Sequence, residues 1–207
     1  MPTSSKPQIR SLFATPVSIH FLPVAQDVNA ALKPLIVERA GPGLRGQGWR
    51  SETGIAEWCG DPLQTLFRVL RDLADGTTAT RGGGRVTLDW KIEACACLRQ
   101  KGEYRESAAR TGAVWSGVYV VDDGYAKSDD ANLGGEIELL DPRGPLPAMV
   151  APQFGYRIPG GATAGQSELI RPQSGMIVLY PSWLSRAERR HDGEQPRVTI
   201  EFDMTTP

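Results

Sequence analysis

Residues 115–121 have the sequence Trp-Ser-Gly-Val-Tyr-Val-Val and end at the turn formed by residues 122–124 (DDG). Aromatic and β-branched side chains dominate this run, which is typical of a buried strand. Similar short runs follow it, separated by Gly- and Pro-containing turns, at residues 135–141, 176–180 and 197–204. The C-terminal half is therefore predicted to consist of short strands.

An alternating pattern precedes these runs at residues 86–98. One face carries Leu88, Trp90, Ile92, Ala94 and Ala96, and the other carries Asp89, Lys91, Glu93, Cys95 and Cys97. A period of two predicts a strand with one face turned to a core.

Helices are predicted in the N-terminal third. Residues 25–39 form an amphipathic stretch that Pro34 is expected to interrupt. A second helix is predicted to begin with Asp61 as N-cap and Pro62 as first helical residue, because apolar residues then recur at helical spacing. We expect both helices to support a sheet.

Helices followed by many short strands predict a mainly β protein with flanking helices, a sandwich or jelly roll. We expect one domain over residues 1–207. Residues 1–7 would be a disordered lead, 8–84 a strand with buttressing helices, and 85–207 the β core, with the Pro/Gly-rich loop 145–166 as a lid.

Composition restricts the partners. Lys plus Arg number 23 and Asp plus Glu 24, so no basic field attracts nucleic acid or an anionic membrane. No apolar run is long enough for a membrane span, and the first residues lack the apolar core of a secretory signal. Three cysteines are too few for a disulfide scaffold, so we expect a cytoplasmic protein.

Six segments, in order along the chain, resemble a bacterial family of 2-oxoglutarate/iron(II)-dependent oxygenases. The segments are 12–17 (LFATPV), 48–51 (GWRS), 101–104 (KGEY), 115–119 (WSGVY), 141–143 (DPR) and 180–184 (YPSWL). The first of them is similar to the opening strand of the family. The resemblance implies a double-stranded β-helix, the cupin-like jelly roll of these oxygenases.

The same resemblance implies where iron ligands should lie. Such enzymes hold iron with two histidines and a carboxylate or a third histidine, but His20 and His191 are the only histidines in the chain. The ligand positions of the family correspond to Ala108, Arg110 and Arg186 here. Alanine has no ligating atom and arginine stays protonated. We therefore predict that the protein has no metal and no cofactor.

One further position implied by the resemblance is retained. Arg197 matches the arginine with which the family clasps the far carboxylate of 2-oxoglutarate. Arg110, Arg186 and Arg197 would together bind a small anionic substrate, because guanidinium groups grip carboxylate or phosphate with two hydrogen bonds.

Glu201 follows Arg197 and Thr199 on one strand face and is a candidate general acid or base. Tyr104 and Arg110 are further catalytic candidates, and Trp115 and Tyr180 are candidate substrate-binding aromatics. These residues favour a metal-independent lyase, isomerase or cyclase of small-molecule biosynthesis.

Two alternatives stay open. One is a pseudoenzyme that binds a ligand without turnover. A homodimer paired through strand edges is compatible with both an enzyme and a pseudoenzyme. The other is a dioxygenase with unusual ligands, rebuilt from Glu106, His191 or the pair Cys95 and Cys97. Two cysteines are a weak zinc signal, since zinc takes three or four ligands, and His191 is expected in an exposed turn.

Overall fold

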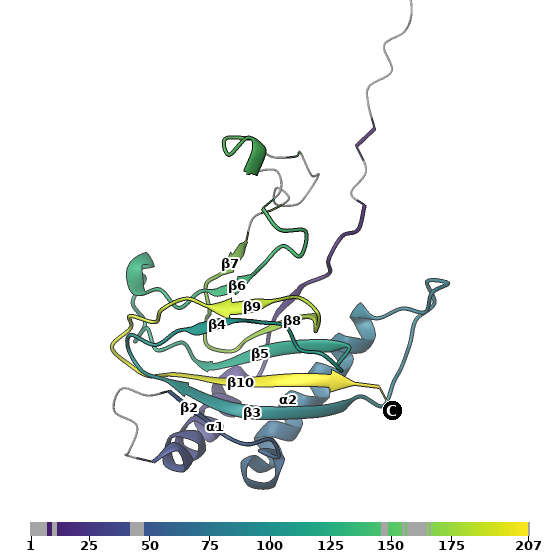
Figure 1. Ribbon diagram of the computed structural model, residues 1–207. Helices are drawn as coiled ribbons and strands as arrows, with labels where there is room; N and C mark the ends of the chain where they lie inside the picture. The colour runs from purple at the N-terminus through teal and green to yellow at the C-terminus, as the bar shows by residue number, and fades with distance from the viewer. Residues whose placement is uncertain are drawn as a thin grey trace, which may run out of the picture.

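The computed structural model describes residues 8–9, 12–41, 48–145, 149–154, 156, 165 and 167–206. Its strands form two antiparallel sheets (Figure 1). The major sheet has the order β1 (Ser18–Phe21), β8 (Met176–Pro181), β5 (Trp115–Asp122), β10 (Arg197–Thr205), β3 (Lys91–Arg99) and β2 (Trp49–Arg50). The minor sheet has the order β4 (Arg105–Ala108), β9 (Arg186–Glu188), β6 (Ile137–Leu139) and β7 (Glu168–Ile170).

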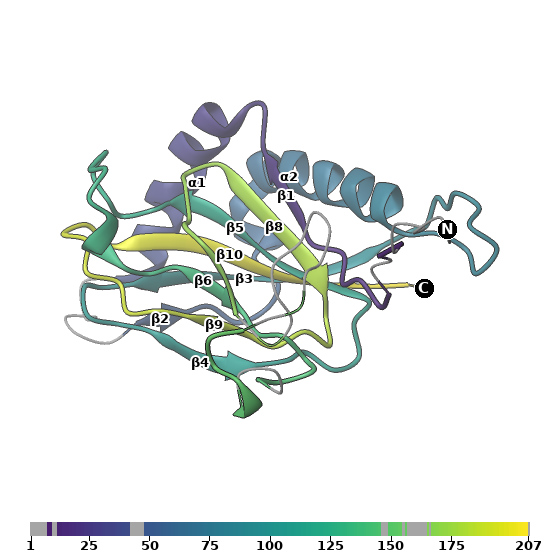
Figure 2. The ribbon, with the colours of Figure 1, turned by 90° about the horizontal axis from the view of Figure 1, so that it is seen from above.

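Two helices, α1 (Ala25–Ala40) and α2 (Ala56–Thr77), cover the face of the major sheet that is turned away from the minor sheet (Figures 1 and 2). A short 3-10 helix, Ala131–Leu133, precedes β6. The main core lies between these helices and the sheet, and a smaller apolar cluster joins β5, β6, β7 and β8. This is the predicted double-stranded β-helix with flanking helices. No helix in the described part of the chain is long and apolar enough to cross a membrane.

Strand β10 shows how alternation divides the two sides of the major sheet. Val198, Ile200, Phe202 and Met204 belong to the core under the helices. Arg197, Thr199, Glu201 and Asp203 alternate with them and therefore face the minor sheet. Strand β3 divides in the same way, so Cys95 and Cys97 share the face of Glu201, as the predicted alternation required.

Both helices differ from their predictions in detail. Helix α1 continues through Pro34, because Pro34 is exposed while Leu32 and Ile36 beside it are fully buried and hold the helix on the core. Helix α2 begins at Ala56, five residues before the predicted N-cap. Gly60 has φ +59° and kinks it, so the predicted start at Asp61 marks the second segment of a longer helix.

The strand boundaries also differ. The predicted opening strand at residues 12–17 is not extended into the sheet, and β1 begins at Ser18 instead. Strands β4, β7 and β9 were not predicted, because they are three or four residues long and carry charged side chains. The predicted lead 1–7 and most of the predicted lid 145–166 lie outside the described residues.

Candidate functional site

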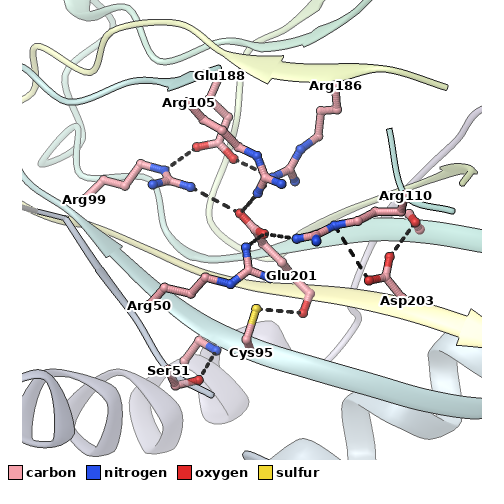
Figure 3. Close-up of polar contacts among 12 residues, drawn as sticks. Arg50, Ser51, Cys95, Arg99, Arg105, Arg110, Arg186, Glu188, Glu201 and Asp203 are labelled. Atoms are coloured by element: carbon pink, nitrogen blue, oxygen red, sulfur yellow. Dashed lines mark hydrogen bonds and ion pairs between the residues drawn. The ribbon is translucent and has the colours of Figure 1, made fainter. Parts of the chain in front are cut away.

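A buried carboxylate lies at the centre of the space between the two sheets. Glu201 on β10 is 5% exposed, and guanidinium groups surround it (Figure 3). Its Oε1 accepts hydrogen bonds from Arg186 Nη2 at 2.8 Å and from Arg99 Nη2 at 3.2 Å, and it pairs with Arg105. Its Oε2 accepts from Arg50 Nη1 at 3.0 Å. One carboxylate on β10 therefore binds arginines from four other strands, β2, β3, β4 and β9.

A second buried carboxylate extends this network. Glu188 on β9 accepts from Arg99 Nε at 2.7 Å and pairs with Arg186 Nη2 at 3.0 Å. Burial by itself would raise the pKa of Glu201, but the charges of Arg186 and Arg105 outweigh burial and hold that pKa well below its usual range. Arg186 and Arg99 likewise lower the pKa of Glu188 against the effect of burial. Both carboxylates are therefore ionised, and both are weak bases.

Guanidinium groups outnumber carboxylates in the ion pairs of this cluster. Its five arginines (Arg50, Arg99, Arg105, Arg110 and Arg186) share three carboxylates (Glu188, Glu201 and Asp203). Arg110 is held loosely, since its nitrogens lie 3.9 Å from Glu201 Oε2 and 3.8 Å from Asp203 Oδ2. Its side chain is 38% exposed. Arg110 can therefore turn to a ligand at little cost.

Two hollows meet at this cluster. A small one of about 30 Å³ lies beside Glu201, Cys95 and Tyr180, which is room for one water molecule. An open groove of about 800 Å³ lies outside it along β2 and β4. Arg50, Arg105 and Arg110 line both hollows. The arginine cluster thus separates a small inner chamber from a groove of small-molecule size.

The predicted ligand positions lie together, but their side chains do not fit an iron ion. Ala108 on β4 is the direct cross-strand partner of Arg186 on β9, and the Arg110 amide bonds the Ser182 carbonyl beside them. Ala108 offers no donor atom, and the guanidinium of Arg186 is held by two buried carboxylates. These three positions therefore do not fit an iron ion, and no step through iron can be derived at them.

Arg197 lies on the same strand face as Glu201 but belongs to a different contact set. Its Nη2 donates to Tyr125 Oη at 3.0 Å and lies 3.2 Å from His191 Nδ1, and its Nε donates to the Asp123 carbonyl at 3.2 Å. Its Nη1 donates to the Gly135 carbonyl. Groups of the protein itself therefore satisfy the guanidinium, and Arg197 is not brought together with Arg110 and Arg186.

His191 is fully buried, which corrects the expectation of an exposed turn. It is held in place because its Nε2 lies 2.9 Å from the Gln195 carbonyl while Arg197 Nη2 approaches its Nδ1. Burial, reinforced by the charge of Arg197, lowers the pKa of His191 and keeps the ring neutral. His191 is therefore part of the Arg197 contact set and does not reach the predicted ligand positions.

The remaining predicted residues divide between the site and other places. Tyr180 lines the inner chamber, and burial raises its pKa. Tyr104 lines the outer groove and is exposed. Trp115 does not reach either hollow, because it faces the helices and its Nε1 donates to Thr78 Oγ1 at 2.9 Å. Glu106 lines the outer groove and is exposed.

Five members of the network were not predicted: Arg50, Arg99, Arg105, Glu188 and Asp203. The sequence holds a partial signal for them. Arg50 lies inside the family-like segment 48–51, and Glu188 follows Arg186 by two residues, which places both on one face of a strand. Arg99 and Arg105 carry no such signal, since only the pairing of β3 with β10 and of β4 with β9 brings them to Glu201.

Two thiols lie on the strand face of Glu201, and that of Cys95 lines the inner chamber with it. Cys95 is the cross-strand partner of Glu201, and Cys97 follows two residues later on the same face. One ligand atom from each of Cys95, Cys97 and Glu201 can lie within 4.8 Å of the other two. A hydrogen bond between the thiols lowers the pKa of Cys95 and raises that of Cys97. Cysteine and carboxylate side chains at this separation are potential metal ligands.

The fold and the site define a class of protein, a double-stranded β-helix with a polar centre between its sheets. A family model described as "Putative 2OG-Fe(II) oxygenase" matches residues 95–203, more than half of the chain. The protein therefore belongs to this oxygenase family. No curated protein matches the chain.

Solved structures share the fold at low identity. A prolyl-4-hydroxylase from Pseudomonas putida has a TM-score of 0.60 and 14% identity over 95% of this chain and 90% of that one. AviO1 from Streptomyces viridochromogenes Tue57 has a TM-score of 0.59 and 15% identity over 93% and 90%. HygX from Streptomyces hygroscopicus, solved with iron bound, has a TM-score of 0.57 and 11% identity over 93% and 82%. These likenesses establish the fold alone.

The prediction that the protein has no metal and no cofactor is contradicted by two findings. The chain belongs to a family named for iron and 2-oxoglutarate, and HygX, which shares its fold, was also solved with nickel and 2-oxoglutarate bound. The chain itself has a cluster of three metal-ligating side chains, Cys95, Cys97 and Glu201, of which Cys95 and Glu201 line the inner chamber. The sequence analysis treated Cys95 and Cys97 as a weak zinc signal because it did not place Glu201 beside them as a third ligand.

Proposed function

We propose that this oxygenase-fold protein is an enzyme of small-molecule metabolism that binds an anionic substrate in the arginine-lined groove. One observation carries the proposal: five guanidinium groups share three carboxylates beside a groove of about 800 Å³. Glu103 and Glu106 also line the groove, but the half-exposed guanidinium groups of Arg50 and Arg110 can each donate hydrogen bonds to a ligand that brings negative charge of its own. Carboxylate and phosphate groups both have this chemistry.

Arg110 and Arg50 are the proposed contacts to the ligand. Their side chains are 38% and 45% exposed, whereas that of Arg186 is 2% exposed. Arg50 donates one bond to Glu201, and Arg110 has only long contacts to carboxylates. A ligand carboxylate can therefore recruit both without breaking the buried part of the network. Glu201 then acts as the anchor that orients the arginines.

Proton transfer in such an enzyme would fall to Tyr180 or Tyr104. Glu201 is a weak base because the charges around it stabilise its ionised form. Tyr180 lies at the inner chamber and Tyr104 on the groove wall, so a ligand that spans both hollows would reach them. The proposed reaction class is that of a lyase, isomerase or cyclase.

A second candidate function is ligand binding without turnover. The observation that favours it is the low basicity of both buried carboxylates, which removes the strongest general-base candidate. The two functions share the anion site and differ only in whether the bound molecule is converted.

Calorimetric titration of the purified, zinc-free protein tests the anion site. The ligands are 2-oxoglutarate, citrate and inorganic phosphate, with the neutral diamide of glutarate as a control. We expect binding of at least one anion, weakening with added salt, and no binding of the diamide. Arg110→Ala should weaken binding about 10- to 100-fold, because one charge-assisted hydrogen bond contributes about 1.5–3 kcal/mol.

Arg68→Ala is the matched control, because Arg68 is exposed on α2, beyond the opposite face of the major sheet. Unchanged anion binding in Arg110→Ala would show that the groove is not the site. Incubation with iron, 2-oxoglutarate and oxygen supplies a second test: stoichiometric iron together with succinate release would replace the proposed reaction class with that of an oxygenase.

A further inference from the structure

Three metal-ligating side chains lie together at the inner chamber and directly beside it, and the proposed anion site does not use them as ligand contacts. Cys95 and Cys97 alternate on β3, and the register of β3 with β10 places Glu201 opposite Cys95. All three are buried, at 2%, 1% and 5% exposure. Both cysteines are free thiols. The major sheet therefore holds two sulfur atoms and a carboxylate on one face, shielded from bulk water.

We propose that Cys95, Cys97 and Glu201 form a binding site for one thiophilic divalent cation of the zinc class. Their ligand atoms lie within 4.8 Å of one another. Tetrahedral zinc with zinc–sulfur bonds of about 2.3 Å places its ligand atoms about 3.5–4 Å apart. Small side-chain rotations close that difference. Two thiolates select zinc or cobalt over magnesium and calcium, which prefer oxygen ligands.

The chamber leaves one coordination position for solvent. Its volume of about 30 Å³ accommodates a single water molecule. Cys95 and Glu201 both line it, so a fourth ligand can come from water. Three protein ligands and one open position are the arrangement of zinc sites that bind a further molecule.

The charges of the cluster tolerate this ion. With both thiols protonated, the five arginines are opposed by Glu188, Glu201, Asp203 and the chamber-lining Glu93, which leaves an excess of one positive charge. Binding of a divalent cation releases two thiol protons, so the excess is the same afterwards. The exchange of two protons for one zinc ion therefore adds no net repulsion from the arginines.

Two polar atoms can make a further contact, either to the ion or to its ligands. Glu201 Oε2 accepts one bond from Arg50 and lies 3.9 Å from Arg110, whereas Oε1 already contacts three arginines. The buried hydroxyl of Thr199 has no hydrogen-bond partner among the described residues. Thr199 is the cross-strand partner of Cys97, so its hydroxyl can donate to a coordinated thiolate. Such a bond would satisfy an otherwise unpartnered buried group.

This site differs from the iron position that the family resemblance implies, which lies at Ala108 and Arg186 on the minor sheet. It also differs from the proposed anion site, because its ligands come from β3 and β10 beside the inner chamber rather than from the walls of the groove. A bound cation here would face the same chamber as Tyr180.

Metal titration of the full chain tests the inference. Protein stripped with chelator under reducing conditions is titrated with zinc in a buffer without carboxylate or phosphate ligands, and bound metal is measured by mass spectrometry. We expect one equivalent of zinc. Cobalt(II) in its place should give the near-ultraviolet absorption of thiolate-to-cobalt charge transfer, which oxygen-only sites lack.

Variants then locate the ion. Cys95→Ala and Cys97→Ala should each weaken zinc binding by about 100-fold or more, beyond the range for loss of an outer-shell partner. Cys59→Ala is the matched control, because Cys59 is equally buried but lies in α2. Absence of cobalt–thiolate absorption in the unmodified protein, or zinc binding that survives in both chamber variants, would overturn the proposal. Because the zinc titration contains no anionic ligand and the anion titration contains no zinc, either proposal can fail alone.

Discussion

Replacement of Glu201 by glutamine should destabilise the protein by more than any other single-charge change in the network. The substitution keeps the shape of the side chain and removes one of three carboxylates that five arginines share. Arg186, at 2% side-chain exposure, would keep only Glu188 as a counter-ion. Breaking a buried ion pair in this way typically costs about 3–5 kcal/mol.

That loss is a large part of a typical stability of about 5–15 kcal/mol. For a chain of this size it corresponds to a fall in Tm of roughly 6–20 °C. Urea unfolding and thermal unfolding followed by circular dichroism measure both quantities. Glu194→Gln is the matched control, because Glu194 pairs with Lys101 at the surface with 77% side-chain exposure, and we expect a change within about 0.5 kcal/mol.

A loss below about 1 kcal/mol for Glu201→Gln would refute the reasoning. It would mean that the arginines relax into water or find other acceptors, and that Glu201 does not hold the centre of the site together.

Three further outcomes follow from the structure. Because the pKa of Glu201 is lowered on folding, its stabilisation is present above the unfolded pKa of about 4.3 and is lost as pH falls through the folded value. Urea titrations between pH 6 and 3 should therefore show a steeper loss for the unmodified protein than for Glu201→Gln, and parallel curves would contradict this. The pKa of His191 is lowered by burial, so stability is lost as pH falls below about 6.5, and His191→Gln should flatten the stability curve between pH 7 and 5. An unaltered slope in this variant would show that the ring does not titrate on unfolding. Gly117→Ala should destabilise by about 1–3 kcal/mol, since its methyl would lie 2.3 Å from the Phe202 ring, whereas Gly76→Ala meets nothing within 4 Å and should be neutral or stabilising. Equal unfolding midpoints for these two alanine variants would contradict the predicted close packing.

The sequence was sufficient for the long strands of the major sheet because their pattern is local. Alternation in β3 and β10 is visible within nine residues and assigns each side chain to a face. The cross-strand pairing of Ala108 with Arg186 could also be predicted, because the family-like segments around these residues fix their alignment. These inferences need only period, spacing and order along the chain.

Which residues make up the site was harder to predict, because that depends on which partners the ends of the charged side chains contact in three dimensions. Arg110, Arg186 and Glu201 do converge, as predicted, but Arg197 on the same strand does not. A period of two cannot separate Glu201 from Arg197, which lies four residues and about 13 Å away along the strand. The two residues differ in their partners: the guanidinium of Arg197 is bound by groups such as the Tyr125 hydroxyl, which comes from a loop after β5.

The charge network also explains how short strands keep their places in the minor sheet. Strand β9 has three residues, with Arg186 and Glu188 turned inward and half-exposed Ala187 between them. So few ladder hydrogen bonds specify register weakly. A slip by one residue would turn Arg186 and Glu188 away from Glu201 and leave its carboxylate with fewer buried partners. Because an unpaired buried charge is far more costly than a lost ladder bond, the same contacts that fill the site fix the register of the strand that carries it.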